Sequence, residues 1–238
     1  MPLLDHFRKP IETRAPWASV GTFWVTALAK SINAALPRDR YLALVTVHLG
    51  DRAEADIAEF ELGSGLPFED HNGHGGTATL LAPAAVATFE ATFPDEFEVQ
   101  IKDLRDDMRL VGAIEFVSKA NKDRESERTQ FVSKCLAYLD AGIGLVLVDV
   151  VTTRSANLHN EVMTALDAPA QAMLPDGPTY VASYRPTRPH ERTRIETWPY
   201  VAAVGKSIPG VPLALKNGPT IRLDLEGTYL DVLAGHNL

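Results

Sequence analysis

Hydrophobic and polar residues follow each other along the chain in patterns that change between helical and strand-like periods. Segment 17–36 carries apolar residues at helical spacing and is followed by Pro37, so we expect an amphipathic helix that ends there. The β-branched segment 41–49 predicts a strand, and the alternating segment 55–62 predicts a second strand joined to it as a hairpin. The glycine-rich polar segment 63–78 predicts an exposed loop.

The middle of the chain has the most regular pattern. Segments 97–103 and 108–117 are joined by the turn-like sequence LRDD and predict a β-hairpin. Segment 126–141 predicts a helix with an apolar stripe, and the continuous apolar segment 144–152 predicts a strand that is buried on both faces. A strand, a helix and a strand in this order predict a βαβ unit with a right-handed crossover.

Small polar and glycine residues mark the expected ends of the central helix. Ser126 is its expected N-cap, and Gly142 is expected to end it. Towards the C-terminus, segments 179–186 and 192–200 predict another hairpin, and segment 225–235 predicts a short helix.

Together these elements predict a single α/β domain that spans residues 1–238. We expect a mixed central β-sheet flanked by helices, with the helix at 17–36 on one face and the helix at 126–141 on the other. The region around 63–96 is interpreted as a loop insertion, because the strands expected on its two sides complete one sheet.

The composition describes a globular protein and limits its setting. Of the 238 residues, 45% are hydrophobic and 23% are charged, and the single cysteine, Cys135, excludes an internal disulfide and fits a reducing cytosol. The N-terminal sequence is charged and interrupted by prolines, so we expect no signal peptide. No apolar run reaches the roughly 18–20 residues of a membrane helix, and we therefore expect a cytoplasmic protein without a membrane partner.

Glu115 is the residue that departs most from this simple pattern. It lies in the apolar sequence RLVGAIEFV, where a carboxylate costs several kcal/mol unless it meets a cation, a metal or hydrogen-bond donors. Candidate cations follow at Lys119, Lys122 and Lys134, the last on the edge of the apolar stripe of the next helix. Two interpretations stay open: a structural Glu–Lys pair, and a metal-dependent hydrolytic site.

A metal site needs more oxygen ligands than Glu115 alone. Asp56 is the best second candidate, because it lies at the start of a strand beside apolar residues. Gln100 offers a neutral oxygen on the strand that is expected to pair with the strand of Glu115. Hard oxygen ligands of this kind favour Mg²⁺ or Mn²⁺ over zinc.

Three sequences stand out in the middle of the chain: IEFVSKANK, the helix containing KCLAYLDAG and the strand LVLVDVV. In this order they resemble the central motifs of a bacterial family known as domain of unknown function 4058. The pair Ala55–Asp56 stands where the family has Pro–Asp, and YVASYRPTRP, IPGVPLAL and IRLDLEGTYLDVL follow its later landmarks. The resemblance therefore covers most of the chain.

That family is similar in turn to the PD-(D/E)XK nuclease superfamily, whose relatives carry a Pro–Asp strand, E-x-x-S-P and a K-x-x-x-Y helix. The resemblance implies a restriction-endonuclease-like core and a divalent-metal-dependent phosphodiesterase or DNA endonuclease. It makes Asp56 and Glu115 metal ligands, and Lys134 or Lys122 the catalytic lysine. Val117 stands where the superfamily's basic motif has its lysine. The alternative is a catalytically inactive protein with this fold that acts as a binding or assembly module.

The charge distribution bears on nucleic acid as a partner. The net charge is -8, and residues 51–107 contain 14 acidic against 3 basic residues, which would repel DNA unless metal ions neutralise part of this charge. Four arginines in YRPTRPHERTR form the one basic concentration, which either contacts a phosphate backbone or lies in a solvated loop. An exposed edge strand beside the hairpin at 97–117 makes a homodimer possible.

Overall fold

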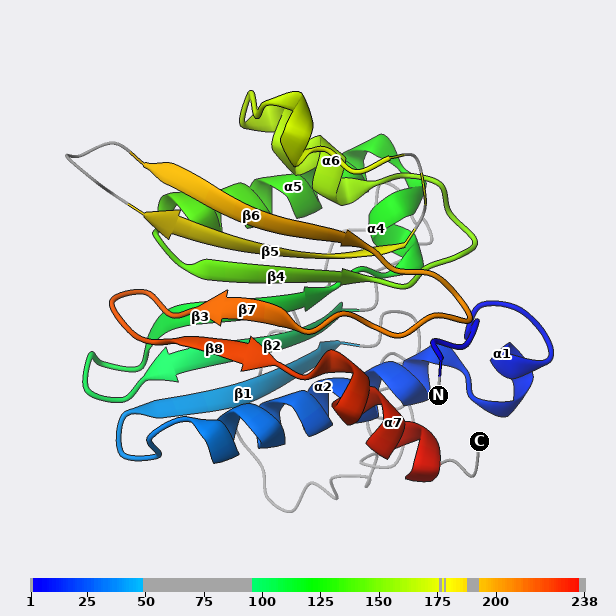
Figure 1. Ribbon diagram of the computed structural model, residues 1–238, viewed down its shortest axis with the longest axis horizontal. Helices are drawn as coiled ribbons and strands as arrows, with labels where there is room; N and C mark the ends of the chain where they lie inside the picture. The colour runs from blue at the N-terminus through cyan, green and yellow to red at the C-terminus, as the bar shows by residue number, and fades with distance from the viewer. Residues whose placement is uncertain (1, 49–95, 176, 178, 188–192, 236–238) are drawn as a thin grey trace, which may run out of the picture.

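The structure is a computed structural model that describes residues 2–48, 96–175, 177, 179–187 and 193–235. Within these residues, eight strands form a six-stranded sheet and a two-stranded ribbon (Figure 1). The strands are β1 (Tyr41–His48), β2 (Glu96–Asp103), β3 (Arg109–Phe116), β4 (Gly144–Asp149), β5 (Tyr180–Thr187), β6 (Arg194–Val201), β7 (Val211–Ala214) and β8 (Thr220–Leu223). The helices are α1 (Ile11–Arg14), α2 (Trp17–Ala35), α4 (Lys119–Asp123), α5 (Glu125–Asp140), α6 (Leu158–Ala165), α7 (Leu225–Gly235) and the 3-10 helix η1 (Ala170–Ala172).

The large sheet is mixed, as the sequence predicts. Its strands follow the order β1-β2-β3-β4-β5-β6, and β3 and β4 are its only parallel pair among the described strands. The hairpin β2–β3, the helix α5 and the parallel strand β4 confirm the expected β-α-β succession. Strand β4 is buried along its whole length, which explains why its sequence is continuously apolar.

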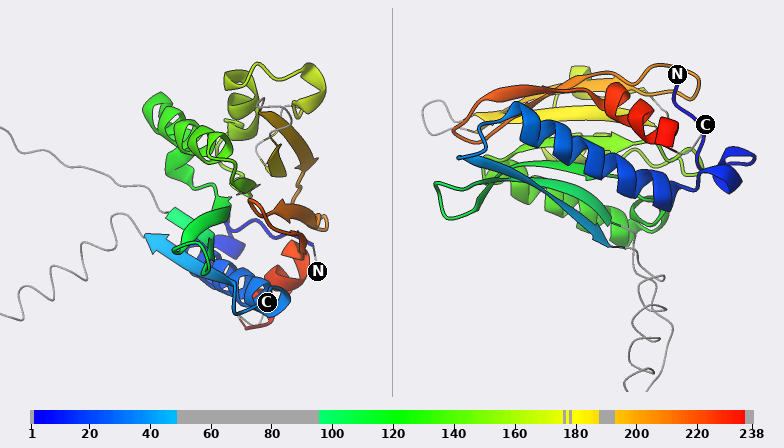
Figure 2. Two further views of the ribbon diagram at one scale, coloured as in Figure 1. Left: turned by 90° about the vertical axis from the view of Figure 1, so that its left-hand side faces the viewer. Right: turned by 90° about the horizontal axis from the view of Figure 1, so that it is seen from below.

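Helices cover both faces of the sheet, which confirms the predicted α/β arrangement (Figure 2). On one face, α2 and α7 enclose an apolar core with residues such as Trp24, Phe97 and Tyr229. On the other face, α5 and α6 pack over a second core that includes Cys135 and Tyr184. The ribbon β7–β8 packs beside β4 and β5 and contributes to the first core.

The ends of α5 differ in part from the prediction. The helix begins at Glu125 after Arg124, which makes no side-chain cap, so the expectation that Ser126 is the N-cap is wrong. A capping box forms one element earlier, where Ser118 and Asn121 begin the short helix α4. Gly142 ends α5 as expected, because its φ of 77° places it in the left-handed region that glycine adopts without strain.

Several elements lie where the sequence analysis expected none. Helix α6 and the ribbon β7–β8 are short, and the ribbon contains Pro212, so neither carries a long periodic pattern. The expected strand at 55–62, its hairpin and most of the insertion at 63–96 lie outside the described residues; Glu96 itself begins β2. Among the residues that the structure describes, no helix combines the length and apolar character that a membrane span requires.

Candidate functional site

The pairing of β2 with β3 places two glutamates opposite each other. Glu98 is the register partner of Glu115, and residues paired in this way point to the same face of the sheet. That face is covered by α5. Both residues are only 3% exposed. The sheet therefore holds two carboxyl groups side by side in an environment where either charge needs compensation.

Helix α5 supplies that compensation from two successive turns. Lys134 Nζ lies 2.6 Å from Glu115 Oε1 and 3.4 Å from Glu98 Oε2. The hydroxyl of Tyr138, four residues later on the same helical face, donates a hydrogen bond of 2.8 Å to Glu98 Oε1. We call Glu98, Glu115, Lys134 and Tyr138 the glutamate–lysine cluster.

The cluster contains one cation for two carboxyl groups, and the pKa values reflect this imbalance. Burial, and secondly the charge of Glu98, raise the pKa of Glu115 from 4.5 to about 8, although Lys134 opposes the shift. Burial lowers the pKa of Lys134, but Glu115 and then Glu98 outweigh it and leave that pKa raised. At neutral pH the cluster therefore keeps a proton on its carboxyl pair, with Lys134 charged.

A cavity of about 200 Å³ opens beside the cluster. Its lining includes Glu115, Lys134 and the polar side chains of Glu96, Asn121, Glu127 and Gln130. The side chain of Lys134 is 31% exposed, whereas that of Glu115 is 4% exposed. A small ligand in the cavity can thus reach the lysine directly and the glutamate at its edge.

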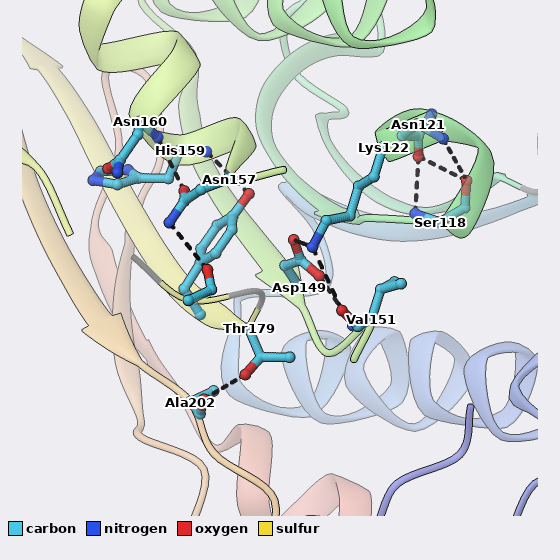
Figure 3. A network of polar contacts seen from close by, with 12 residues as sticks. Ser118, Asn121, Lys122, Asp149, Val151, Asn157, His159, Asn160, Thr179 and Ala202 are labelled. Carbon is cyan, nitrogen blue, oxygen red and sulfur yellow. Dashed lines mark hydrogen bonds and ion pairs between the residues drawn. The ribbon is translucent and has the colours of Figure 1, made fainter. Parts of the chain in front are cut away.

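Lys122 lies in a different polar network from the one that the sequence analysis considered. Its ammonium contacts Asp149 Oδ2 at 2.8 Å, and both side chains are completely buried (Figure 3). Asp149 also accepts a hydrogen bond from the backbone N–H of Val151. Burial raises the pKa of Asp149 to about 7, against the opposing effect of Lys122. The pair joins α4 to the end of β4, and Lys122 does not line the cavity beside the glutamate–lysine cluster.

The structure does not place the other two predicted metal ligands, Gln100 and Asp56, at the glutamate–lysine cluster. Gln100 lies two positions from Glu98 on the same face of β2, opposite Ala113, and does not line the cavity. Asp56 lies outside the described residues. Within the described part of the chain, no three histidine, cysteine, aspartate or glutamate residues form a group that could hold a metal ion.

Comparison with known proteins assigns this chain to no family. No family model, curated protein or solved structure matches this chain. The resemblance to domain of unknown function 4058 and to the nuclease superfamily, including the restriction-endonuclease-like core, therefore stays a prediction.

Glu98 and Tyr138 are the residues of the cluster that the sequence analysis missed as site candidates. The period of two in FEVQIKD places Glu98 and Gln100 on one face, so the sequence alone left the partner of Glu115 open. The register of the β2–β3 ladder pairs Glu115 with Glu98 and places Gln100 opposite Ala113. Tyr138 had a signal, since the sequence KCLAY matches the K-x-x-x-Y pattern of the superfamily.

Proposed function

We propose that this protein is a divalent-metal-dependent phosphodiesterase, with DNA as its substrate class, and that its centre is the glutamate–lysine cluster. The observation that carries the proposal is the pairing of two buried glutamates that share one lysine at the edge of an open cavity. The carboxyl group that Lys134 does not compensate keeps a proton, which a divalent cation can displace, and groups with perturbed pKa values of this kind are concentrated where proteins bind ligands or catalyse reactions.

The chemistry of these donors fits a magnesium or manganese ion. Mg²⁺ typically uses one or two protein carboxylates and completes its octahedron with waters and substrate phosphate oxygens. Glu115, which lines the cavity, and Glu98, which faces it, would provide the two carboxylates, and Asp56, which the resemblance makes a ligand, would add to them. Bound there, the ion would supply Lewis-acid activation of a phosphoryl oxygen and of water.

The residues of this chain have separate roles in the proposal. Lys134 lines the cavity beside Glu115, and its ammonium would donate hydrogen bonds to a phosphate oxygen there and stabilise the negative charge that develops on it. Tyr138 holds Glu98 in place through its hydroxyl and keeps it turned toward Glu115. Glu115 must lose its proton before it can act as a ligand, because its pKa is about 8.

The test combines metal binding with phosphodiester cleavage. We expect Mg²⁺ or Mn²⁺ to bind the protein in calorimetric titrations, and the protein to cleave single-stranded, duplex or branched DNA in their presence. Glu115→Gln should abolish metal binding, and Lys134→Met should lower the cleavage rate at least about a hundredfold. The matched control is Glu196→Gln, which breaks an exposed ion pair with Arg185 on β5 and β6 and should change neither property.

The second candidate is a catalytically inactive protein that acts as a binding or assembly module. Two contacts favour it: Lys134 and Tyr138 each contact one carboxyl oxygen of Glu98, so protein groups already satisfy both oxygens. A well-folded protein that neither binds these metals nor cleaves any of the three DNA forms would overturn the phosphodiesterase proposal and leave this alternative.

A further inference from the structure

Asn121 is the more deeply buried of the two amide side chains that line the cavity beside the glutamate–lysine cluster. It is 8% exposed, whereas the other amide, Gln130, lies exposed on α5. Asn121 belongs to α4, the short helix that follows β3 and packs against α5. Buried polar groups are normally hydrogen-bonded, so the partners of this amide indicate what it does.

The oxygen of the Asn121 amide is held by Ser118. The backbone N–H of Ser118 donates a hydrogen bond of 2.9 Å to Oδ1 of Asn121, and the hydroxyl of Ser118 donates another of 2.9 Å to the same atom (Figure 3). A backbone N–H only donates, so the atom that it meets is the amide oxygen and not the nitrogen. The capping box of α4 therefore fixes which way round the amide lies.

The nitrogen of the same amide, Nδ2, is the group that remains for another partner. Within the described residues it donates no hydrogen bond, and it keeps access to solvent. Because Asn121 lines the cavity, this access leads into the cavity. The fold thus presents a buried and oriented N–H donor to the space beside Glu115 and Lys134, where a ligand with an acceptor oxygen would satisfy it.

We propose that Asn121 is a substrate-binding residue, whose Nδ2 donates a hydrogen bond to a non-bridging oxygen of the phosphodiester. The arrangement suits an anion, because Ser118 occupies the amide oxygen that would repel a phosphate and leaves the donor for the ligand. Lys134 lines the same cavity, so a charged donor and a neutral donor would hold the phosphate together.

This inference rests on the proposed phosphodiesterase function, because of the charge of the cavity. Glu96, Glu115 and Glu127 all contribute to its lining, so a phosphate would enter only beside a bound divalent cation. The volume of about 200 Å³ is below the roughly 300–1,000 Å³ of sites that enclose larger small molecules. We therefore expect the phosphate group to enter the cavity and the bases to stay outside it.

Dimethyl phosphate is a suitable probe, because it is a stable phosphodiester without bases. In nitrogen-15 nuclear magnetic resonance spectra of the wild-type protein saturated with Mg²⁺, its addition should shift the side-chain amide signals of Asn121 saturably. The signals of Asn33 on α2, whose amide is bonded at both ends to the backbone of Ala43, should not shift. Without Mg²⁺ neither set of signals should shift. This measurement detects the contact without any substitution.

A matched pair of variants measures the contribution of the donor. Asn121→Asp keeps the oxygen that Ser118 binds and removes the Nδ2 donor, so it should bind dimethyl phosphate at least about tenfold more weakly in the presence of Mg²⁺. Asn157→Asp makes the same change at the N-cap of α6, outside the cavity lining, and its affinity should stay within about twofold of the wild type.

The outcomes distinguish this inference from the proposed function. The protein could bind Mg²⁺ and cleave DNA while the Asn121 signals do not shift, or while Asn121→Asp binds dimethyl phosphate as the wild type does. Either result would mean that Asn121 serves only to cap α4 with Ser118, and would overturn the inference alone. If neither Mg²⁺ binding nor cleavage is found, the phosphodiesterase proposal is wrong, and this inference is wrong with it.

Discussion

At the scale of single residues, Glu115 combines burial with a like-charged neighbour, two effects that both favour its protonated form. Glu98 faces it across the β2–β3 pair, and Lys134 compensates only one of the two charges. The folded protein therefore holds the Glu115 proton more tightly than the unfolded chain does, which links the stability of the fold to pH.

The first prediction concerns this linkage. The favourable contribution of protonated Glu115 is fully present below its ordinary pKa of 4.5 and is lost as pH rises to about 8. The free energy of unfolding should fall more steeply over this range in the wild type than in Glu115→Gln, as measured by urea unfolding. Asp149, whose pKa is also raised, contributes equally to both proteins and cancels in the difference. Identical slopes for the two proteins would contradict the assigned pKa.

A second prediction separates the two candidate lysines. Lys122→Met leaves the completely buried Asp149 without its cation and should destabilise the fold by about 3–5 kcal/mol in chemical denaturation. The double variant Lys122→Met with Asp149→Leu should recover much of that loss, because it removes both charges together. Metal affinity of the folded fraction should stay unchanged in both variants. If folded Lys122→Met lost metal affinity, Lys122 and not Lys134 would be the lysine of the metal site, which would contradict our assignment.

The pairing of Glu115 with Lys134 could be predicted from the sequence, because it depends on patterns within one strand and one helix. A carboxylate in an apolar strand requires a cation, and Lys134 is placed on the right helical edge by its spacing within α5. The choice between Glu98 and Gln100 depended on the register in which β2 pairs with β3, and in this register Glu98 faces Glu115. Non-local register of this kind is not contained in the periodicity of either strand.

At the scale of elements, long periodic segments were predictable and short ones were not. Helix α2 and strand β4 are long enough, or apolar enough, for their patterns to exclude other structures. The ribbon β7–β8 has four residues in each strand and gains its stability from packing against the large sheet. Its position is a tertiary property, which a local pattern cannot show.

The third prediction tests this packing. A Cβ atom at Gly144, the first residue of β4, would overlap the backbone carbonyl oxygen of Ala214 in β7. Backbone cannot move aside as a side chain can, so Gly144→Ala should destabilise the protein by more than about 3 kcal/mol in thermal or urea unfolding. Gly235→Ala, which meets no atom within 4 Å, is the matched control and should stay within about 0.5 kcal/mol of the wild type. A neutral Gly144→Ala would mean that β7 does not pack on β4 in this way.

At the scale of the whole molecule, the mixed sheet places the glutamate–lysine cluster and its cavity on the face that α5 covers. Within the described residues, β1 and β6 are the edge strands of the large sheet. The possible homodimer through an edge strand beside the β2–β3 hairpin stays a prediction, and sedimentation analysis of the full chain would decide it.

The central claim is that the glutamate–lysine cluster is a site for a divalent cation. At pH 7 Glu115 is protonated, since its pKa is about 8, so a cation that binds its carboxylate must displace this proton. The most direct measurement is calorimetric titration with Mn²⁺ in two buffers of different ionisation enthalpy. We predict saturable binding with release of about one proton per ion in the wild type, and neither effect in Glu115→Gln. No binding, or binding without proton release that persists in Glu115→Gln, would contradict the claim.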